Sequence, residues 1–161
     1  ALFLAEYEAE STGSTIISTL IGAAVKDRYI TSIYDPITKY LPELEGSAYD
    51  GVSLREVMTM TSGAKWNEDY TNKKSDVSLA GSTEPRPGDF DPLVTYMSKL
   101  KREAEPGTKF VYKTGETDLA GLALARALAA GEAPGPAALR EPGERAVGQL
   151  IARTRKAPRI R

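Results

Sequence analysis

The residue types that this chain lacks limit the catalytic chemistry that it can perform. Its 161 residues include no Cys and no His, which excludes a thiol nucleophile, a disulfide, a Ser-His-Asp triad and the commonest metal ligand. A zinc site made only of carboxylates would be unusual, so we expect no metal and no cofactor. A hydrolase with a covalent step would need Ser or Thr as nucleophile and Lys, Tyr or a carboxylate as base.

Four segments carry motifs that occur together, in this order, in one family. They read STLIGAAVKD at 18–27, DPITKYLP at 35–42, VSLREVMTMTSG at 52–63 and PGTKFVYKTG at 106–115. Over roughly residues 11–125 the chain resembles the β-lactamase and penicillin-binding-protein superfamily of serine hydrolases. Within it, the class C-like branch, with its esterases and nylon-oligomer hydrolases, is the most similar.

The resemblance assigns the family's Ser-x-x-Lys motif to the segment Ser11-Thr-Gly-Ser14. In that motif a spacing of three residues puts nucleophile and base on one helix face, with Cβ atoms about 5–6 Å apart. Ser11 then occupies the nucleophile position, while Ser14 stands where the basic lysine belongs and would contact substrate instead. On local sequence alone, Ser11 is more typical of a helix N-cap.

The second family motif, Tyr-x-Asn, corresponds to Tyr112-Lys113-Thr114. The resemblance implies that Tyr112 assists proton transfer and that Thr114 binds substrate; a core tyrosine beside a turn is the alternative. Lys113-Thr114-Gly115 also spells the third motif, Lys-Thr-Gly, but it overlaps the second and precedes a helix, so we interpret it as coincidence. Lys113 should point away from Tyr112 because neighbours in an extended run face opposite ways. Trp66 is expected either at a substrate-facing rim or as an anchor of a solvated loop.

Apolar periodicity and capping patterns predict the elements that would position these residues. Residues 1–7 are predicted to form a short strand, and the apolar spacing over 14–28 predicts a helix. Ser53 and Glu56 form a capping-box pattern. The elements expected after it are, in chain order, a helix ending at Gly63, a long polar loop over 64–90, a helix from Asp91-Pro92 to about Arg102, an extended run at 109–112 and a helix from Thr117 to near Gly131.

The charge distribution divides the chain into two parts. Residues 1–125 hold 13 Lys and Arg against 19 Asp and Glu, whereas residues 126–161 hold 8 against 3. We predict that 126–161 is a basic tail rich in Pro, Gly, Ala and Arg, either disordered or aberrant in origin. The tail has no aromatic residue and no reader motif, so we expect no nucleic-acid partner. No apolar stretch approaches the roughly 18 residues of a membrane span, and we expect no membrane partner.

Taken together, these patterns predict an α+β, β-lactamase-like fold with mostly its helical region present, one or two strands and an incomplete sheet. The partial domain would span 1–125. The implied function is a serine hydrolase acting on a small-molecule ester, amide or β-lactam through an acyl-enzyme, impaired by the missing lysine and third motif. The alternative is a non-catalytic remnant or binding module that keeps the helical scaffold. No signal peptide is visible; family members are often exported, so the localisation, like the oligomeric state, is left open.

Overall fold

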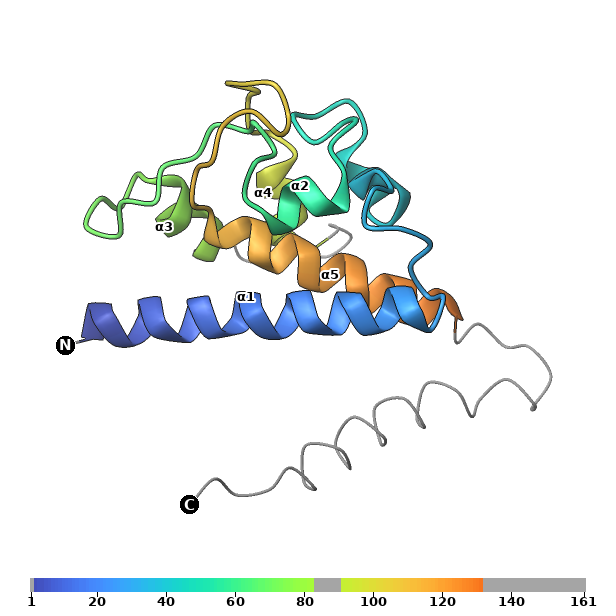
Figure 1. Ribbon diagram of the computed structural model, residues 1–161. Helices are drawn as coiled ribbons and strands as arrows, with labels where there is room; N and C mark the ends of the chain where they lie inside the picture. The colour runs from blue at the N-terminus through green and yellow to red at the C-terminus, as the bar shows by residue number, and fades with distance from the viewer. Residues whose placement is uncertain (1, 83–90, 132–161) are drawn as a thin grey trace, which may run out of the picture.

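The computed structural model describes residues 2–82 and 91–131, with side chains from Gly13 onward. The described part is helical. Its α-helices are α1 (Leu2–Lys26), α2 (Leu54–Met58), α3 (Asp76–Gly81), α4 (Pro92–Met97) and α5 (Thr114–Gly131), and its 3-10 helices are η1 (Ile37–Lys39) and η2 (Pro42–Leu44). Helix α5 contacts α1, α2, α3 and α4 and is therefore the central element. Figure 1 shows α1 along one side of α5, with the short helices and loops on the other.

The two long helices, α1 and α5, lie side by side and run in the same direction (Figure 1). Near the middle of the pair, a Cβ added at Gly121 would lie 3.3 Å from the Ile17 side chain. At the far end, Gly131 lies against the ring of Tyr29. The Ile17–Gly121 contact sets the register of the two helices, and Tyr29, which follows the end of α1, extends the contact along α5 to Gly131.

The core fills the space between α5 and the segments that follow α1. Buried side chains from both long helices include Ile21 and Ala24 of α1 and Leu119 and Ala123 of α5. The segment between α1 and α2 contributes a second group of fully buried residues, namely Ile30, Ile37, Leu41, Leu44, Tyr49 and Val52. All of these belong to one hydrophobic cluster. The loops around η1 and η2 therefore keep fixed positions although they contain little regular structure.

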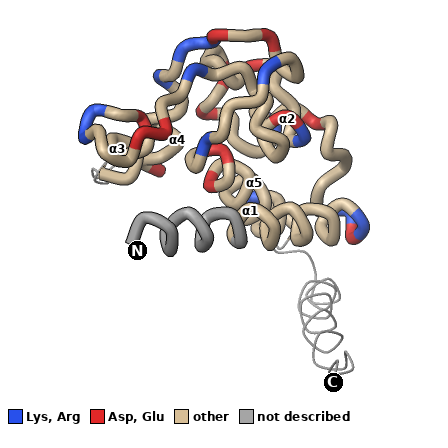
Figure 2. The backbone as a smooth tube through the Cα atoms, turned by 60° about the vertical axis from the view of Figure 1, so that its left-hand side comes forward, with Lys and Arg blue, Asp and Glu red and all other residues tan. Residues whose placement is uncertain are grey.

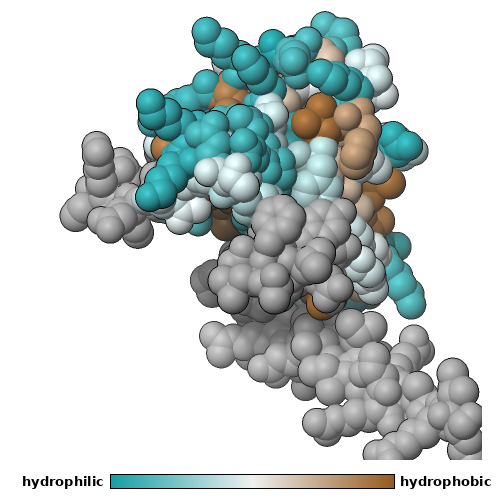
Figure 3. All heavy atoms as spheres, turned by 90° about the vertical axis from the view of Figure 1, so that its left-hand side faces the viewer, coloured by the Kyte–Doolittle hydropathy of each residue, from teal (hydrophilic) through white to brown (hydrophobic). Residues whose placement is uncertain are grey.

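Among the described side chains, charged residues gather away from α1. Figure 2 shows Lys, Arg, Asp and Glu on the loops and short helices, whereas the described side chains of α1 are uncharged until its end at Lys26. Seen from the side of α3, the described surface is mainly hydrophilic with small hydrophobic patches (Figure 3). None of the helices in the described ranges is long and apolar enough to cross a membrane.

Several predicted elements are present, and the capping box is confirmed. Ser53 accepts a hydrogen bond from the Glu56 backbone, while the Glu56 carboxylate accepts from the Ser53 N–H. The helix predicted from Asp91-Pro92 forms but ends at Met97 rather than near Arg102. The last helix begins at Thr114, three residues earlier than predicted, and is described up to Gly131. Residues 126–131 of the predicted tail belong to α5, and from 132 onward the tail lies outside the described residues.

Other predicted elements are wrong. Residues 1–7 do not form a strand, because from Leu2 they continue α1, and their Ala, Leu and Glu residues favour a helix. The predicted loop over 64–90 contains α3, which Ser75 caps by accepting from the Ser78 N–H. The extended run at 109–112 forms no strand. Within the described ranges, β-pairing is limited to isolated bridges, Pro36 with Ser53 and Ala64 with Arg102.

Gly63 joins the segment after α2 to the segment before α5, and it requires glycine for two reasons. Its φ is +78°, and a Cβ there would lie 2.0 Å from the Ala104 carbonyl oxygen. That close approach follows from the hydrogen bonds that the Gly63 carbonyl accepts from the N–H groups of Glu103 and Ala104, at 2.8 and 3.1 Å. Gly46, at φ +72°, has nothing within 4 Å of the same position.

We predict that Gly63→Ala destabilises the chain more than Gly46→Ala. The left-handed conformation alone costs an alanine about 1–2 kcal/mol, which is the loss expected at Gly46. At Gly63 the clash with Ala104 adds roughly 1–3 kcal/mol, as overpacking does in a dense interior. Urea unfolding followed by far-UV circular dichroism measures both variants. Equal losses would show that the 63–104 contact does not form.

Candidate active site

An open groove of about 500 Å³ lies between α3, α4 and the start of α5. Its walls include Trp66, Tyr70, Val77, Leu93, Thr114 and Asp118. Trp66 and Thr114, two of the predicted substrate-binding residues, thus lie in one groove although they are far apart in the sequence. The apolar side chains offer contact area, and the hydroxyl groups of Tyr70 and Thr114 offer hydrogen bonds to a bound molecule.

Glu68 ties the loop that carries Trp66 to the first residue of α5. Its carboxylate accepts hydrogen bonds from the Trp66 indole N–H, the Tyr70 hydroxyl at 2.7 Å, and both the hydroxyl and the backbone N–H of Thr114, the latter at 3.2 Å. The Tyr70 and Thr114 hydroxyls are also 2.9 Å apart. A carboxylate on the first N–H groups of a helix satisfies donors that lack partners within the helix and favours the helix dipole.

The structure separates Ser14 from the groove. Ser14, which is half-buried, lines a different and much smaller cavity together with Thr117 and Ala120 of α5 and with Met58 and Met60. Its backbone carbonyl accepts a hydrogen bond from the Ser18 hydroxyl at 2.8 Å. Ser14 therefore faces α5 and α2. It lies near Thr117, three residues further along α5 than Thr114, and does not share a cavity with Trp66 and Thr114.

Ser11 lies inside α1 rather than at its N-cap, so the capping role suggested by local sequence is wrong. Its position along the helix pair follows from the register. Ser14 and Thr117 line one cavity, and the helices are parallel, so Ser11, three residues before Ser14, stands level with Thr114, three residues before Thr117. Three residues correspond to a rise of about 4.5 Å along either helix. The backbone of Ser11 is thus level with the first turn of α5.

Tyr112 is half-buried and lies two residues before the start of α5. Its neighbours on either side are held in place. The Val111 N–H donates to the Met60 carbonyl at 3.0 Å, and the Lys113 ammonium donates to the Val111 carbonyl at 3.2 Å. The Tyr112–Thr114 segment is therefore attached to the end of α2 on one side and to the groove on the other.

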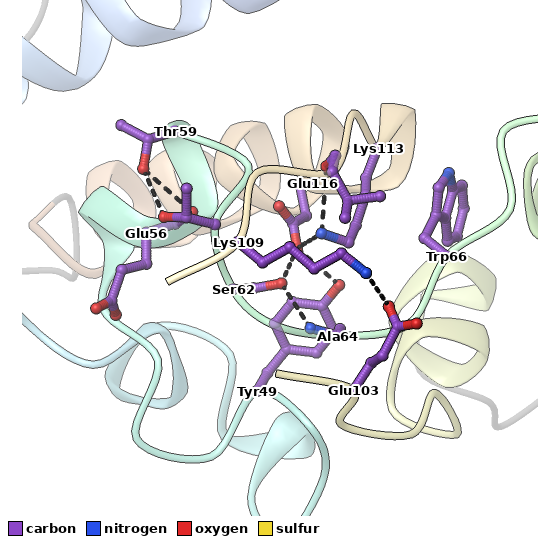
Figure 4. Close-up of polar contacts among 12 residues, drawn as sticks. Tyr49, Glu56, Thr59, Ser62, Ala64, Trp66, Glu103, Lys109, Lys113 and Glu116 are labelled. Atoms are coloured by element: carbon purple, nitrogen blue, oxygen red, sulfur yellow. Dashed lines mark hydrogen bonds and ion pairs between the residues drawn. The ribbon is translucent and has the colours of Figure 1, made fainter. Parts of the chain in front are cut away.

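Beneath the groove lies a buried polar cluster, which we define as Tyr49, Ser62, Lys113 and Glu116 (Figure 4). The other three side chains converge on one carboxylate oxygen of Glu116. Glu116 Oε1 accepts from the Ser62 hydroxyl and from the Tyr49 hydroxyl at 3.2 Å, and it lies 3.5 Å from the Lys113 ammonium. Lys113, Ser62, Tyr49 and Glu116 are all fully buried. Burial raises the pKa of Glu116 to about 7, against the lowering effects of Lys113, Ser62 and Tyr49.

The buried polar cluster contains a serine, a carboxylate and a lysine, residue types that can make a nucleophile and its base. Complete burial of Ser62, Lys113 and Glu116 keeps a substrate from reaching them, so their arrangement is structural. The Lys113 ammonium is not free to act as a base, because it is engaged with Glu116 and Val111. Lys113-Thr114-Gly115 lies at the start of a helix and not on a strand.

Among residues 2–82 and 91–131, no group of three or more His, Cys, Asp and Glu residues is placed to hold a metal ion.

Comparison with known proteins identifies the family. The β-lactamase family model matches residues 7–138, and the chain belongs to this family. It is 32% identical over 113 residues to a 6-aminohexanoate-dimer hydrolase from Paenarthrobacter ureafaciens, an alignment that covers 68% of this chain. The predicted membership of the β-lactamase-like serine hydrolase superfamily is therefore confirmed.

The predicted fold is confirmed as well. A class C β-lactamase mutant superposes with a TM-score of 0.54 at 28% identity over 74% of this chain. A class C β-lactamase in complex with cefoxitin superposes with a TM-score of 0.53 at 29% identity over 73% of it. The chain spans only 28% of the length of the hydrolase and 29% of each β-lactamase. The helical character and the absence of strands among the described residues are those of a partial β-lactamase fold.

Glu68, Tyr70 and Glu116 are site residues that sequence reasoning missed. Glu116 is three residues from Lys113, a spacing that puts side chains together on a helix, and this signal was available once the helix was known to start at Thr114. Glu68 and Tyr70 had no such signal, because their partner Thr114 lies in a distant part of the sequence. Because residues 64–90 were interpreted as a loop, the orientation of the Glu68 and Tyr70 side chains could not be predicted.

We predict that Glu68→Ala destabilises the chain by about 1–3 kcal/mol, because it leaves the Trp66 indole N–H and the Thr114 N–H without their acceptor. Glu105→Ala is the matched control, since Glu105 is exposed, and it should change the free energy of unfolding by less than about 0.5 kcal/mol. Urea unfolding followed by circular dichroism measures both. Equal, small effects of the two substitutions would contradict a structural role of the Glu68 contacts.

Proposed function

We propose that this chain carries part of the active site of a serine hydrolase that cleaves small-molecule esters or amides through an acyl-enzyme on Ser11. The observation that carries the proposal is the register of α1 and α5, which sets the Ser11 backbone level with the Tyr112–Thr114 segment. Membership of the β-lactamase family supports the reaction class. The relative named for hydrolysis of a 6-aminohexanoate dimer supports a small amide as substrate.

In the proposed reaction, the Ser11 hydroxyl attacks the substrate carbonyl and its proton passes to water, either directly or through the Tyr112 hydroxyl, which releases its own proton as it takes up that of Ser11. The leaving alcohol or amine takes up a proton, and water then hydrolyses the acyl-enzyme and regenerates the Ser11 hydroxyl. The groove between Trp66 and Thr114 would hold the substrate and exclude part of its hydration shell. The general base is the missing component, because Ser14 has no useful basicity near neutral pH.

We predict that Ser14→Lys raises the rate of p-nitrophenyl acetate hydrolysis by roughly 10²–10⁴, the contribution of a positioned general base. In the Ser14→Lys background, Ser11→Ala should return the rate to that of a protein-free blank, because it removes the nucleophile. Ser18→Ala, on the same helix, is the matched control and should leave the rate unchanged. A rate that Ser11→Ala does not lower would contradict the assignment of Ser11 as nucleophile.

The second candidate function is a non-catalytic remnant or binding module that retains the helical scaffold. The serine at position 14, where the family's lysine belongs, favours it. A fluorophosphonate probe distinguishes the two candidates, because it reacts with an activated serine. Covalent labelling mapped to Ser11 by mass spectrometry excludes the remnant, whereas an unlabelled chain supports it.

A further inference from the structure

We propose that Glu116 is a positioning residue for the groove: its carboxyl holds the segment carrying Trp66 against the segment carrying Tyr112 and Thr114, so that gain or loss of its proton changes the geometry of the groove. The proposal concerns the shape of the groove and does not depend on whether Ser11 is a nucleophile.

The buried polar cluster joins both walls of the groove. Ser62 belongs to the segment that leads into Trp66, and its hydroxyl donates to Glu116 while accepting from the Ala64 N–H at 3.1 Å. Lys113 lies between Tyr112 and Thr114 in the chain, and its ammonium is 3.5 Å from Glu116. One carboxylate thus contacts a residue from each wall, as Figure 4 shows for Ser62, Lys113 and Glu116.

Trp66 packs directly on the helical turn that carries Glu116. A Cβ added at Gly115 would lie 3.1 Å from the Trp66 ring and 2.8 Å from the Met97 side chain. The ring is therefore in contact with the backbone next to Glu116, so a movement of that turn would displace the ring. The edge of Tyr96 meets the same ring at a centroid distance of 6.4 Å and an interplanar angle of 87°.

The charge of the Glu116 carboxyl affects the distances within the buried polar cluster. Glu116 Oε2 is buried and has no hydrogen-bond partner among the described residues, whereas Oε1 has three polar neighbours. When the carboxyl is ionised, its charge is stabilised by Lys113 and by the hydroxyl groups of Tyr49 and Ser62, which draw in around Oε1. When it is protonated, the attraction to Lys113 is lost and the buried ammonium keeps only the Val111 carbonyl. The two protonation states therefore favour different distances within the buried polar cluster.

Trp66 makes this proposal testable, because it is the only tryptophan of a chain without His or Cys. Burial places the pKa of Glu116 near 7, and no other side chain type ordinarily titrates between pH 5.5 and 8.5 when Cys and His are absent. The fluorescence emission of Trp66 should therefore show one transition with a midpoint near pH 7 while far-UV circular dichroism stays constant. Glu116→Gln should abolish this transition, which also separates it from titration of the α-amino group.

Two more conservative variants identify the group that causes the transition if Glu116→Gln does not fold. Tyr49→Phe removes a hydrogen bond that lowers the pKa of Glu116, so the midpoint should move up by about 0.4–1 pH unit. Tyr96→Phe is the matched control: it alters a ring beside Trp66 and a hydrogen bond to Asp76, and it should change the emission without moving the midpoint. A flat emission profile in the unmodified chain overturns the proposal. A midpoint that Tyr49→Phe leaves in place, or moves down, also overturns it.

Discussion

Helix α5 packs along α1 in the same direction, and this contact determines which residues can meet at the candidate site. Gly121 accommodates the Ile17 side chain and Gly131 accommodates Tyr29, so the helices cannot slide by a turn without losing both fits. The same register sets Ser11 level with Thr114. Residues near the beginning of the chain and residues roughly a hundred positions later are thereby brought to one end of a helix pair, which is the condition for any chemistry that uses both.

The first turn of α5 is held from two sides by two carboxylates with different environments. Glu68 binds Thr114 at the groove, whereas Glu116 lies fully buried with Lys113, Ser62 and Tyr49. Both link α5 to the segment that runs from Ser62 to Tyr70. This double attachment explains how a groove can be defined in a chain whose described residues form no sheet, and why it lies where the polar residues of a loop meet a helix N-terminus.

A structural feature could be predicted from the sequence when the residues that determine it lie close together in the chain. The capping box at Ser53 is set by residues within one turn, and this prediction is confirmed. The family resemblance identified the fold because four ordered motifs are hard to match by chance. Residues 1–7 were misassigned because a short apolar run favours strand and helix equally. The contacts of Glu68, and those of Glu116 with Tyr49 and Ser62, depend on tertiary packing, which no spacing in the sequence encodes.

The most direct test of this account is whether position 11 lies beside position 114. The chain contains no cysteine, so Ser11→Cys with Thr114→Cys can be treated with a short bifunctional maleimide, and the intramolecular link can be measured by mass spectrometry. Ser11→Cys with Ala129→Cys is the control, because Ala129 lies about 22 Å further along α5 at 1.5 Å per residue. The account predicts efficient linkage of 11 to 114 and none of 11 to 129. Linkage of 11 to 129, or failure of the 11–114 pair to link while both thiols are reactive, would contradict it.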